Sequence, residues 1–241
     1  MVTAMTIEEL ADRLDHAAAT RTPCEQLGEL SQKDAYEVQR AVVDRRIRRG
    51  ERAMGVKLGF TSRAKAAQMG VSDVIAGQLT TGMLLGHTFD LDPYIHPRIE
   101  PEIAFRLGRH SVVEAVAPAL EIIDSRYRDF TFSLSDVIAD NASAAGFVVG
   151  DWQPVGEVND RDVILEFDGR IIESGSTAAI LGDPMLSVAA ADRLAAEYRI
   201  PLPPGSILLA GAATPAVAIT PGTRVTAKIE GLGELEVAVR G

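Results

Sequence analysis

The chain has 241 residues, of which 46% are hydrophobic and 24% are charged, and its formal net charge is −10 at pH 7. This composition excludes a disordered chain, no apolar run approaches the roughly 20 residues of a membrane-spanning helix, and the acidic balance argues against a nucleic-acid surface. We expect a soluble protein with one core, and a lone cysteine, Cys24, together with the lack of a leader-like N-terminus favours the cytoplasm.

Two helices are predicted at the start of the chain. Residues 6–9 (Thr-Ile-Glu-Glu) and 31–34 (Ser-Gln-Lys-Asp) match the capping-box pattern, and apolar residues at helical spacing follow each of them. The arginine-rich run 45–49 falls at the end of the second helix, where cations interact favourably with the helix dipole. The sequence therefore predicts a small helical region over residues 1–50 and a β-rich domain over residues 51–241.

The β-rich part of the chain consists of short apolar runs separated by glycine and proline. Strands are predicted at 55–59, 99–107, 116–124, 145–150, 162–168, 206–210, 215–219, 223–230 and 234–239, and helices at 62–69 and 184–198. Few of these strands are separated by a helix long enough for a crossover. A mainly antiparallel or mixed sheet that curls on itself is therefore favoured over a doubly wound parallel sheet.

Three glutamates stand out by their position. Glu100 and Glu102 lie one residue apart in the segment 96–105, so a strand would place both on one face, and Glu121 follows in the apolar run 116–123. An ionised carboxylate among Val, Leu and Ile is costly unless it is paired, protonated or bound to a metal. Oxygen ligands suit magnesium or manganese, so the pattern indicates a divalent-cation site. The alternative is that Glu100 and Glu102 form the solvated face of an amphipathic edge strand.

Lys57 is the second unusual residue, because lysine is scarce here and its neighbours over residues 54–60 are apolar or glycine. A partly desolvated ammonium is a tunable acid and a partner for anions. The alternative is a lysine that snorkels from the end of a strand.

Polar clusters beside apolar strands are weaker candidates. Asp124-Ser125-Arg126 and the segment 139–143 can be turn and cap residues, and the small residues of 211–216 can cradle a carboxylate. The histidines show no metal-ligand spacing, and the chain has neither a phosphate loop nor a dinucleotide fingerprint, so a classical zinc site, a Ser-His-Asp triad and nucleotide binding have little support.

Several segments occur together and in order as in one known family. These are Gly-Val-Lys57-Leu-Gly-Phe-Thr-Ser, Arg98-Ile-Glu100-Pro-Glu102-Ile-Ala, Leu120-Glu121-Ile-Ile-Asp124-Ser-Arg126, Ala-Asp140-Asn141-Ala-Ser143, Leu181-Gly-Asp-Pro184 and Ala210-Gly-Ala-Ala-Thr214. Over nearly the whole chain, they resemble the hydratase/decarboxylase branch of the fumarylacetoacetate hydrolase superfamily. The resemblance implies an α+β fold with a central rolled, mixed β-structure and peripheral helices.

The resemblance also implies a site and its partners. Glu100, Glu102 and Glu121 would bind Mg2+, or Mn2+ in its place, and Lys57 would be the catalytic residue that stabilises a dienolate or handles its proton. Residues expected at the substrate are Leu58, Ile75, Asp140, Asn141 and Thr214. The family further implies a small 2-oxo dicarboxylate as substrate, a homo-oligomer, and a complex with a hydratase that takes the product.

Two activities of this branch share almost the same site: decarboxylation of 2-oxohex-3-enedioate (4-oxalocrotonate) and hydration of 2-hydroxypenta-2,4-dienoate, both in the meta-cleavage breakdown of aromatic compounds. The segments 62–71 and 122–130 are closer to the decarboxylase. Hydratases tend to carry an aspartate where this chain has Ile75, and isoleucine cannot relay a proton for the added water. Decarboxylation is therefore favoured, with hydration as the alternative.

The sequence differs from the family pattern at two places, and two other functions are alternatives to decarboxylation and hydration. The segment 108–116 is shorter than is usual and lacks a helix, and Asp183 replaces a common histidine. A carbon-carbon bond hydrolase is disfavoured because no His-Glu pair is evident. A non-catalytic subunit that stabilises a partner enzyme stays open, although retention of the three glutamates and Lys57 argues against it.

Overall fold

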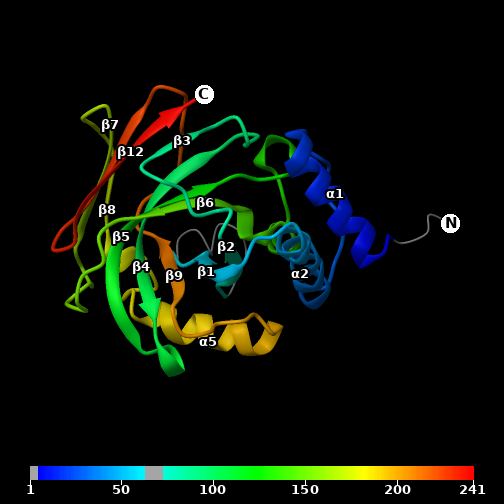
Figure 1. Cartoon of the computed structure of the whole chain (residues 1–241), viewed down its shortest axis with the longest axis horizontal. Helices are drawn as coiled ribbons and strands as arrows, with labels where there is room; N and C mark the ends of the chain where they lie inside the picture. The colour runs from blue at the N-terminus through cyan, green and yellow to red at the C-terminus, as the bar shows by residue number, and fades with distance from the viewer. Residues whose placement is uncertain (1–4, 63–72) are drawn as a thin grey trace.

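The computed structural model describes residues 5–62 and 73–241, which form two β-sheets, with the helices packed against the first of them (Figure 1). The first sheet contains β1 (Ala53–Gly59), β2 (Ile75–Thr80), β4 (Arg98–Leu107), β5 (Val113–Ile123), β6 (Ala144–Val149), β9 (Ser206–Ala212) and β10 (Val217–Ala218). The second contains β3 (Thr88–Asp90), β7 (Asp162–Phe167), β8 (Arg170–Ser176), β11 (Arg224–Ile229) and β12 (Gly233–Arg240). The helices are α1 (Ile7–Thr20), α2 (Gln32–Arg48), α4 (Leu134–Ala139) and α5 (Leu186–Tyr198).

Both sheets are mixed. The first has the order β2-β1-β9-β4-β5-β6 with β10 paired to β4, and the second has the order β3-β12-β11-β7-β8. Only β1 with β9 and β3 with β12 are parallel among the described pairs; the other pairs are antiparallel. This confirms the predicted α+β fold with a curled, mixed β-structure.

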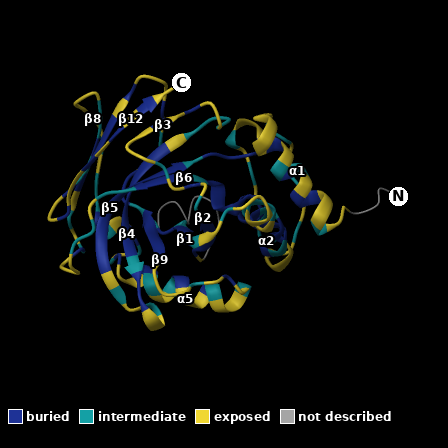
Figure 2. Cartoon of the chain, viewed as in Figure 1, coloured by how far each residue is buried: buried dark blue, intermediate teal, exposed yellow. Residues whose placement is uncertain are grey.

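The sheets pack against each other through β-branched and aliphatic side chains. Ile99, Leu120 and Ile122 of the first sheet share an apolar cluster with Val225 and Val237 of the second. A larger cluster joins α1, α2 and α5 to strands β1, β2, β4 and β9. Buried residues consequently run along β4, β5 and β9 at the centre of the molecule, whereas exposed residues mark the outer faces of the helices (Figure 2).

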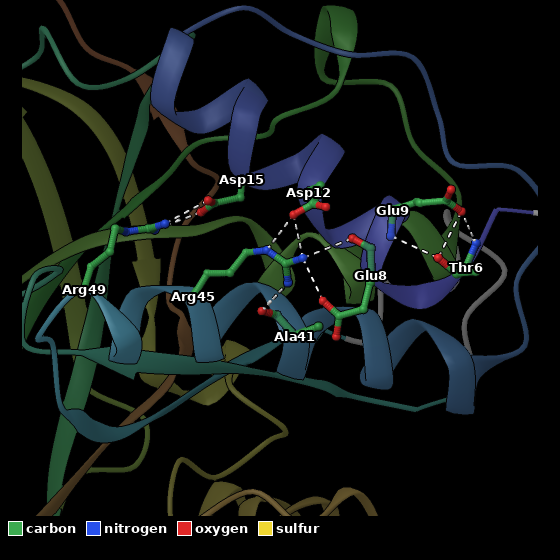
Figure 3. A network of polar contacts seen from close by, with 8 residues as sticks. All are labelled: Thr6, Glu8, Glu9, Asp12, Asp15, Ala41, Arg45 and Arg49. Carbon is green, nitrogen blue, oxygen red and sulfur yellow. Dashed lines mark hydrogen bonds and ion pairs between the residues drawn. The ribbon is translucent and has the colours of Figure 1, made fainter.

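Helices α1 and α2 lie on the side of the molecule away from β7, β8 and β12 (Figure 1) and are joined by ion pairs. Arg45, whose side chain is 11% exposed, contacts Glu8 at 2.8 Å and Asp12 at 2.6 Å, and Arg49 contacts Asp15 at 2.8 Å (Figure 3). The arginines at the end of α2 therefore form ion pairs with acidic residues of α1, in addition to their favourable interaction with the dipole of α2.

We expect Arg45→Ala to lower the free energy of unfolding by about 1 kcal/mol, because its loss removes two partly buried charge contacts and the packing of the arginine stem. Urea unfolding measures this effect, and the exposed Arg48 on the same helix provides the control, Arg48→Ala. Added salt should narrow the difference between the two variants. Equal losses for both variants would contradict a specific contribution from Arg45.

The capping residues behave as the sequence predicts. The Thr6 hydroxyl accepts a hydrogen bond from the backbone N–H of Glu9, and the Glu9 carboxylate accepts one from the backbone N–H of Thr6, while Ser31 caps α2. Asp183 has a related role, because its carboxylate accepts a hydrogen bond from the backbone N–H of Met185 just before α5.

Some elements were not predicted. β2, β3, β8 and α4 are additional, and the short segment 108–112 joins β4 to β5 through a 3₁₀ turn at Arg109–Ser111. The helix predicted at 62–69 lies, apart from its first residue, outside the described residues. Within the described part of the chain, no helix combines the length and apolar character that crossing a membrane requires.

Candidate metal centre and adjoining cavity

The three glutamates converge at the centre of the first sheet. Glu100 of β4 is directly opposite Glu121 of β5, and Glu102 is the next residue of β4 on the same face. One carboxylate oxygen from each residue lies within 4.8 Å of the others, and all three side chains are buried. β4 is paired on both sides, with β5 and β9, so the interpretation of Glu100 and Glu102 as a solvated edge is wrong.

The geometry of this cluster fits a divalent cation. Glu102 Oε2 accepts a hydrogen bond from the backbone N–H of Gly211 at 2.9 Å, but Glu102 Oε1 and Glu121 Oε1 are buried with no hydrogen-bond partner among the described residues. Buried carboxylate oxygens without a partner are energetically costly, and a hard cation is the ligand that oxygen clusters of this kind take up.

The pKa values of the glutamates in the cluster also favour a bound divalent cation. Burial, followed by the charges of Glu121 and Glu100, raises the pKa of Glu102 well above its ordinary value. Burial also raises the pKa of Glu121 to about 7, against the opposing effect of Lys57. Three close carboxylates therefore resist simultaneous ionisation, and a doubly charged cation removes that resistance.

Lys57 projects from β1 into this cluster. Its side chain is buried, its Nζ lies 2.9 Å from Glu121 Oε2, and it donates a hydrogen bond to the carbonyl oxygen of Ala142 at 3.2 Å. Burial alone would lower the pKa of Lys57, but Glu121, Glu100 and Glu102 outweigh it and the net direction is upward. Lys57 is therefore a protonated, buried ammonium, and the snorkelling alternative is wrong.

A cavity of about 370 Å³ opens beside the cluster. Four of the residues predicted at the site line it, namely Lys57, Leu58, Ile75 and Glu100. Its other walls are mostly apolar, with Ile123, Phe130, Phe132, Val137 and Ala142 among them. The cavity therefore has charged residues, Lys57 and Glu100, on one side and a largely apolar wall elsewhere.

One wall of the cavity is a backbone segment in an unusual conformation. Asn141, Ala142 and Ser143 have φ values of 53°, 52° and 58°, which are left-handed conformations for three successive non-glycine residues. The Asn141 side chain holds the segment by accepting a hydrogen bond from the backbone N–H of Gln78 at 2.7 Å and donating one to its carbonyl oxygen at 2.9 Å.

Asp140 and Ser143 flank this segment in different roles. Asp140 is paired with the Arg126 guanidinium and also accepts a hydrogen bond from the Arg126 backbone N–H at 2.9 Å. Ser143 lines the cavity, and its buried hydroxyl has no hydrogen-bond partner among the described residues. The predicted residues Asp140 and Asn141 thus support the turn and do not line the cavity, whereas Ser143, which was not predicted as a substrate contact, lines it.

Thr214 follows β9 and is buried, with its hydroxyl donating to the carbonyl oxygen of Pro215 at 3.2 Å. Its neighbours Ala212, Pro215 and Ala216 line the cavity, while Thr214 is not among the lining residues.

Position 211, whose backbone N–H binds Glu102, requires glycine, because its φ is 125° and a Cβ would lie 2.2 Å from Thr61 Oγ1.

Comparisons with known proteins show the family to which the chain is similar. The fumarylacetoacetate (FAA) hydrolase C-terminal family matches residues 93–240. The chain is 50% identical to a 4-oxalocrotonate decarboxylase of a Pseudomonas species, covering 98% of this chain and 99% of the relative. It is 35% identical to a 2-keto-4-pentenoate hydratase of Paraburkholderia phymatum, covering 96% and 97%. The solved 4-oxalocrotonate decarboxylase from Pseudomonas putida, complexed with magnesium and adipate, is similar with a TM-score of 0.92 and 32% identity over 99% of both chains.

Proposed function

Because the chain belongs to the fumarylacetoacetate hydrolase family, we propose that it is a Mg2+-dependent decarboxylase that converts 2-oxohex-3-enedioate (4-oxalocrotonate) to 2-hydroxypenta-2,4-dienoate and CO2. The observation that carries the proposal is the buried cluster of three glutamates beside Lys57, in a chain that matches a decarboxylase over nearly its full length. The more distant similarity to a hydratase makes hydration the second candidate.

Glu100, Glu102 and Glu121 would hold the cation, which is magnesium in the solved relative, and Mn2+ suits the same oxygen ligands. When bound, Mg2+ supplies a Lewis acid for the charge that develops on the 2-oxo oxygen of the substrate.

The reaction breaks the bond between the distal carboxylate and its neighbouring carbon. The electron pair moves through the conjugated double bond onto the 2-oxo oxygen, and a proton at that oxygen completes the hydroxydienoate. Lys57 is suited to this last step, because its ammonium is protonated, buried and fixed by Glu121 and the Ala142 carbonyl. Ser143 and the predicted substrate contact Leu58, which both line the cavity, would orient the 2-oxo acid.

The apolar wall favours decarboxylation over hydration. Ile75, Phe130 and Phe132 line the cavity, and none of them can transfer a proton to or from an added water.

We further propose that the protein acts in the cytoplasm, in the meta-cleavage breakdown of aromatic compounds, as a homo-oligomer. A complex with the hydratase that consumes the dienol would suit the instability of that product.

The test is CO2 evolution from 2-oxohex-3-enedioate with and without Mg2+, run beside an assay for hydration of 2-hydroxypenta-2,4-dienoate. We expect CO2 release that requires Mg2+ or Mn2+ and stops on chelation with EDTA. Hydration without CO2 release would replace the decarboxylase proposal with the hydratase. Inactivity in both assays would favour a non-catalytic role.

A further inference from the structure

β4, which carries Glu100 and Glu102, also places an arginine side chain, Arg98, at the cavity. In the antiparallel pair of β4 and β5, Glu100 is opposite Glu121, and on the same face the next pair is Arg98 opposite Ile123. Two residues of a strand span about 6.6–6.8 Å. Arg98 and Ile123 both line the cavity, so a guanidinium lies one pair of residues away from the carboxylate cluster.

Arg98 lacks a charged partner in the part of the chain that the structure describes. It takes part in none of the described ion pairs, whereas Lys57, the other described cation of the cavity wall, is paired with Glu121. The partner of Arg98 is an aromatic ring, because its guanidinium carbon lies 4.6 Å from the centroid of Phe130. Arg98 is exposed, and this cation–π contact orients its guanidinium and leaves its N–H groups available to an anion.

Phe130 is itself held in an unusual way. It and the preceding Asp129 both have φ values of 56°, and the ring of His96 lies 5.0 Å from the Phe130 ring. Non-glycine residues in this conformation are strained, and strain of this kind concentrates at ligand sites. The strained turn thus places the Phe130 ring against Arg98 at the cavity wall.

We propose that Arg98 binds the distal carboxylate of a 2-oxo dicarboxylate and so selects dicarboxylates over monocarboxylates of the same length. This inference rests on the proposed function, which places the 2-oxo acid end of the substrate at the glutamate cluster. A six-carbon chain is long enough to reach from that cluster to the next pair of residues along the strands. There the guanidinium offers a planar pair of N–H donors that matches a carboxylate.

The reaction itself indicates which kinetic constant Arg98 controls. The carboxylate that Arg98 binds is the group that leaves as CO2, so its negative charge, and with it the ion pair, weakens as the bond breaks. An interaction of equal strength in the ground state and the transition state affects KM and not kcat, and one that weakens as the bond breaks also lowers kcat. Arg98 is therefore expected to raise affinity without accelerating the chemical step.

The decisive experiment measures binding with two saturated probes by calorimetry on the Mg2+-loaded protein. 2-Oxoadipate and 2-oxohexanoate have equal chain lengths and differ in the distal carboxylate, and neither has the double bond that decarboxylation requires. We expect the wild type to bind 2-oxoadipate about ten- to a hundredfold more tightly, the range for a charge-assisted pair. Arg98→Ala should lose that preference and keep the affinity for 2-oxohexanoate.

Two further variants separate recognition from structure. Arg106 lies on the same strand over the ring of Trp152, at 5.2 Å, and is not among the residues that line the cavity, so Arg106→Ala should retain the preference. Arg98→Lys keeps the positive charge but lacks the planar pair of N–H donors, so it should retain part of the preference for 2-oxoadipate. In turnover of the unsaturated substrate, Arg98→Ala should raise KM about ten- to a hundredfold and should not lower kcat, which stays unchanged or rises.

The outcomes are distinct. Equal affinity of the wild type for the two probes would overturn the role of Arg98 even if Arg98→Ala failed to fold. A preference that survives in a folded Arg98→Ala would overturn it as well. If the Mg2+-loaded wild type bound neither probe, the proposed function would fail first, and this inference with it.

Discussion

Glu102→Gln will abolish Mg2+ binding and make the metal-free protein more stable than the wild type. Glutamine keeps an oxygen for the Gly211 N–H but removes a buried charge whose pKa is raised mainly by burial and by Glu121. We expect metal-dependent activity to fall by at least about a hundredfold, because a cluster without one of its carboxylates no longer holds the cation. The metal-free variant should gain roughly 1 kcal/mol or more in the free energy of unfolding.

The stability difference should depend on pH in a defined direction. Because the folded-state pKa of Glu102 lies above its ordinary value of 4.5, protonated Glu102 contributes stability that is fully present below that value. The contribution is lost as pH rises through the folded-state pKa. The advantage of Glu102→Gln over the wild type should therefore be absent in acid and grow as pH rises above about 4.5.

Thermal unfolding with EDTA and with excess Mg2+ measures both effects. Mg2+ should stabilise the wild type and have no effect on Glu102→Gln, so the order of stability reverses between the two conditions. Glu114 lies on β5 and is exposed, which makes Glu114→Gln the matched control. If Glu102→Gln still gained stability from Mg2+, Glu102 would not be a metal ligand.

Lys57→Met should have the second large effect, and it should separate binding from chemistry. Removal of the ammonium eliminates the group placed to stabilise the dienolate or to deliver its proton, so kcat should fall by about 10²- to 10⁴-fold. Mg2+ affinity should be retained or increased, because a positive charge 2.9 Å from Glu121 no longer repels the incoming cation.

Calorimetric titration with Mg2+ and measurement of CO2 release test the two halves of this prediction. Lys228 provides the control, because it also pairs with a glutamate, Glu166 at 2.8 Å, but lies on the second sheet and is not among the residues of the cavity. Lys228→Met should leave both properties unchanged. A large loss of Mg2+ affinity with Lys57→Met would assign Lys57 to the assembly of the metal site instead of to the reaction.

The sequence predicted the glutamate cluster because it depends on local rules. Alternation in a strand sets Glu100 beside Glu102, and the cost of burying Glu121 requires a partner. The pairing of β4 with β5 then follows from their apolar faces. β11 and β12 were predictable because polar and apolar residues alternate along both strands.

Other features depend on contacts that sequence spacing does not encode. β2 is buried on both faces and contains Gly77 and Gln78, so it lacks the alternation of a typical strand. α4 spans only six residues, too few for a helical period to be visible. β8 is largely exposed and has no apolar face.

The cavity wall was likewise only partly predictable. Asp140, Asn141 and Ser143 are close in sequence, and which of them faces the cavity depends on three successive left-handed residues. Arg98 appeared in the sequence only as a flank of the glutamate motif. Its place at the cavity depends on the pairing with Ile123 of β5 and on the ring of Phe130, over which its guanidinium lies.

The connection between β4 and β5 has a consequence for how the chain assembles. All three glutamates belong to one hairpin whose strands are joined by residues 108–112, so their contacts are local and should form early in folding. The compensating Lys57 comes from β1, which reaches β4 only through the intervening β9. The hairpin of β4 and β5 therefore brings the three glutamates together before Lys57 can pair with one of them. Divalent cations in a refolding buffer should consequently accelerate assembly of the first sheet as well as stabilise the folded protein.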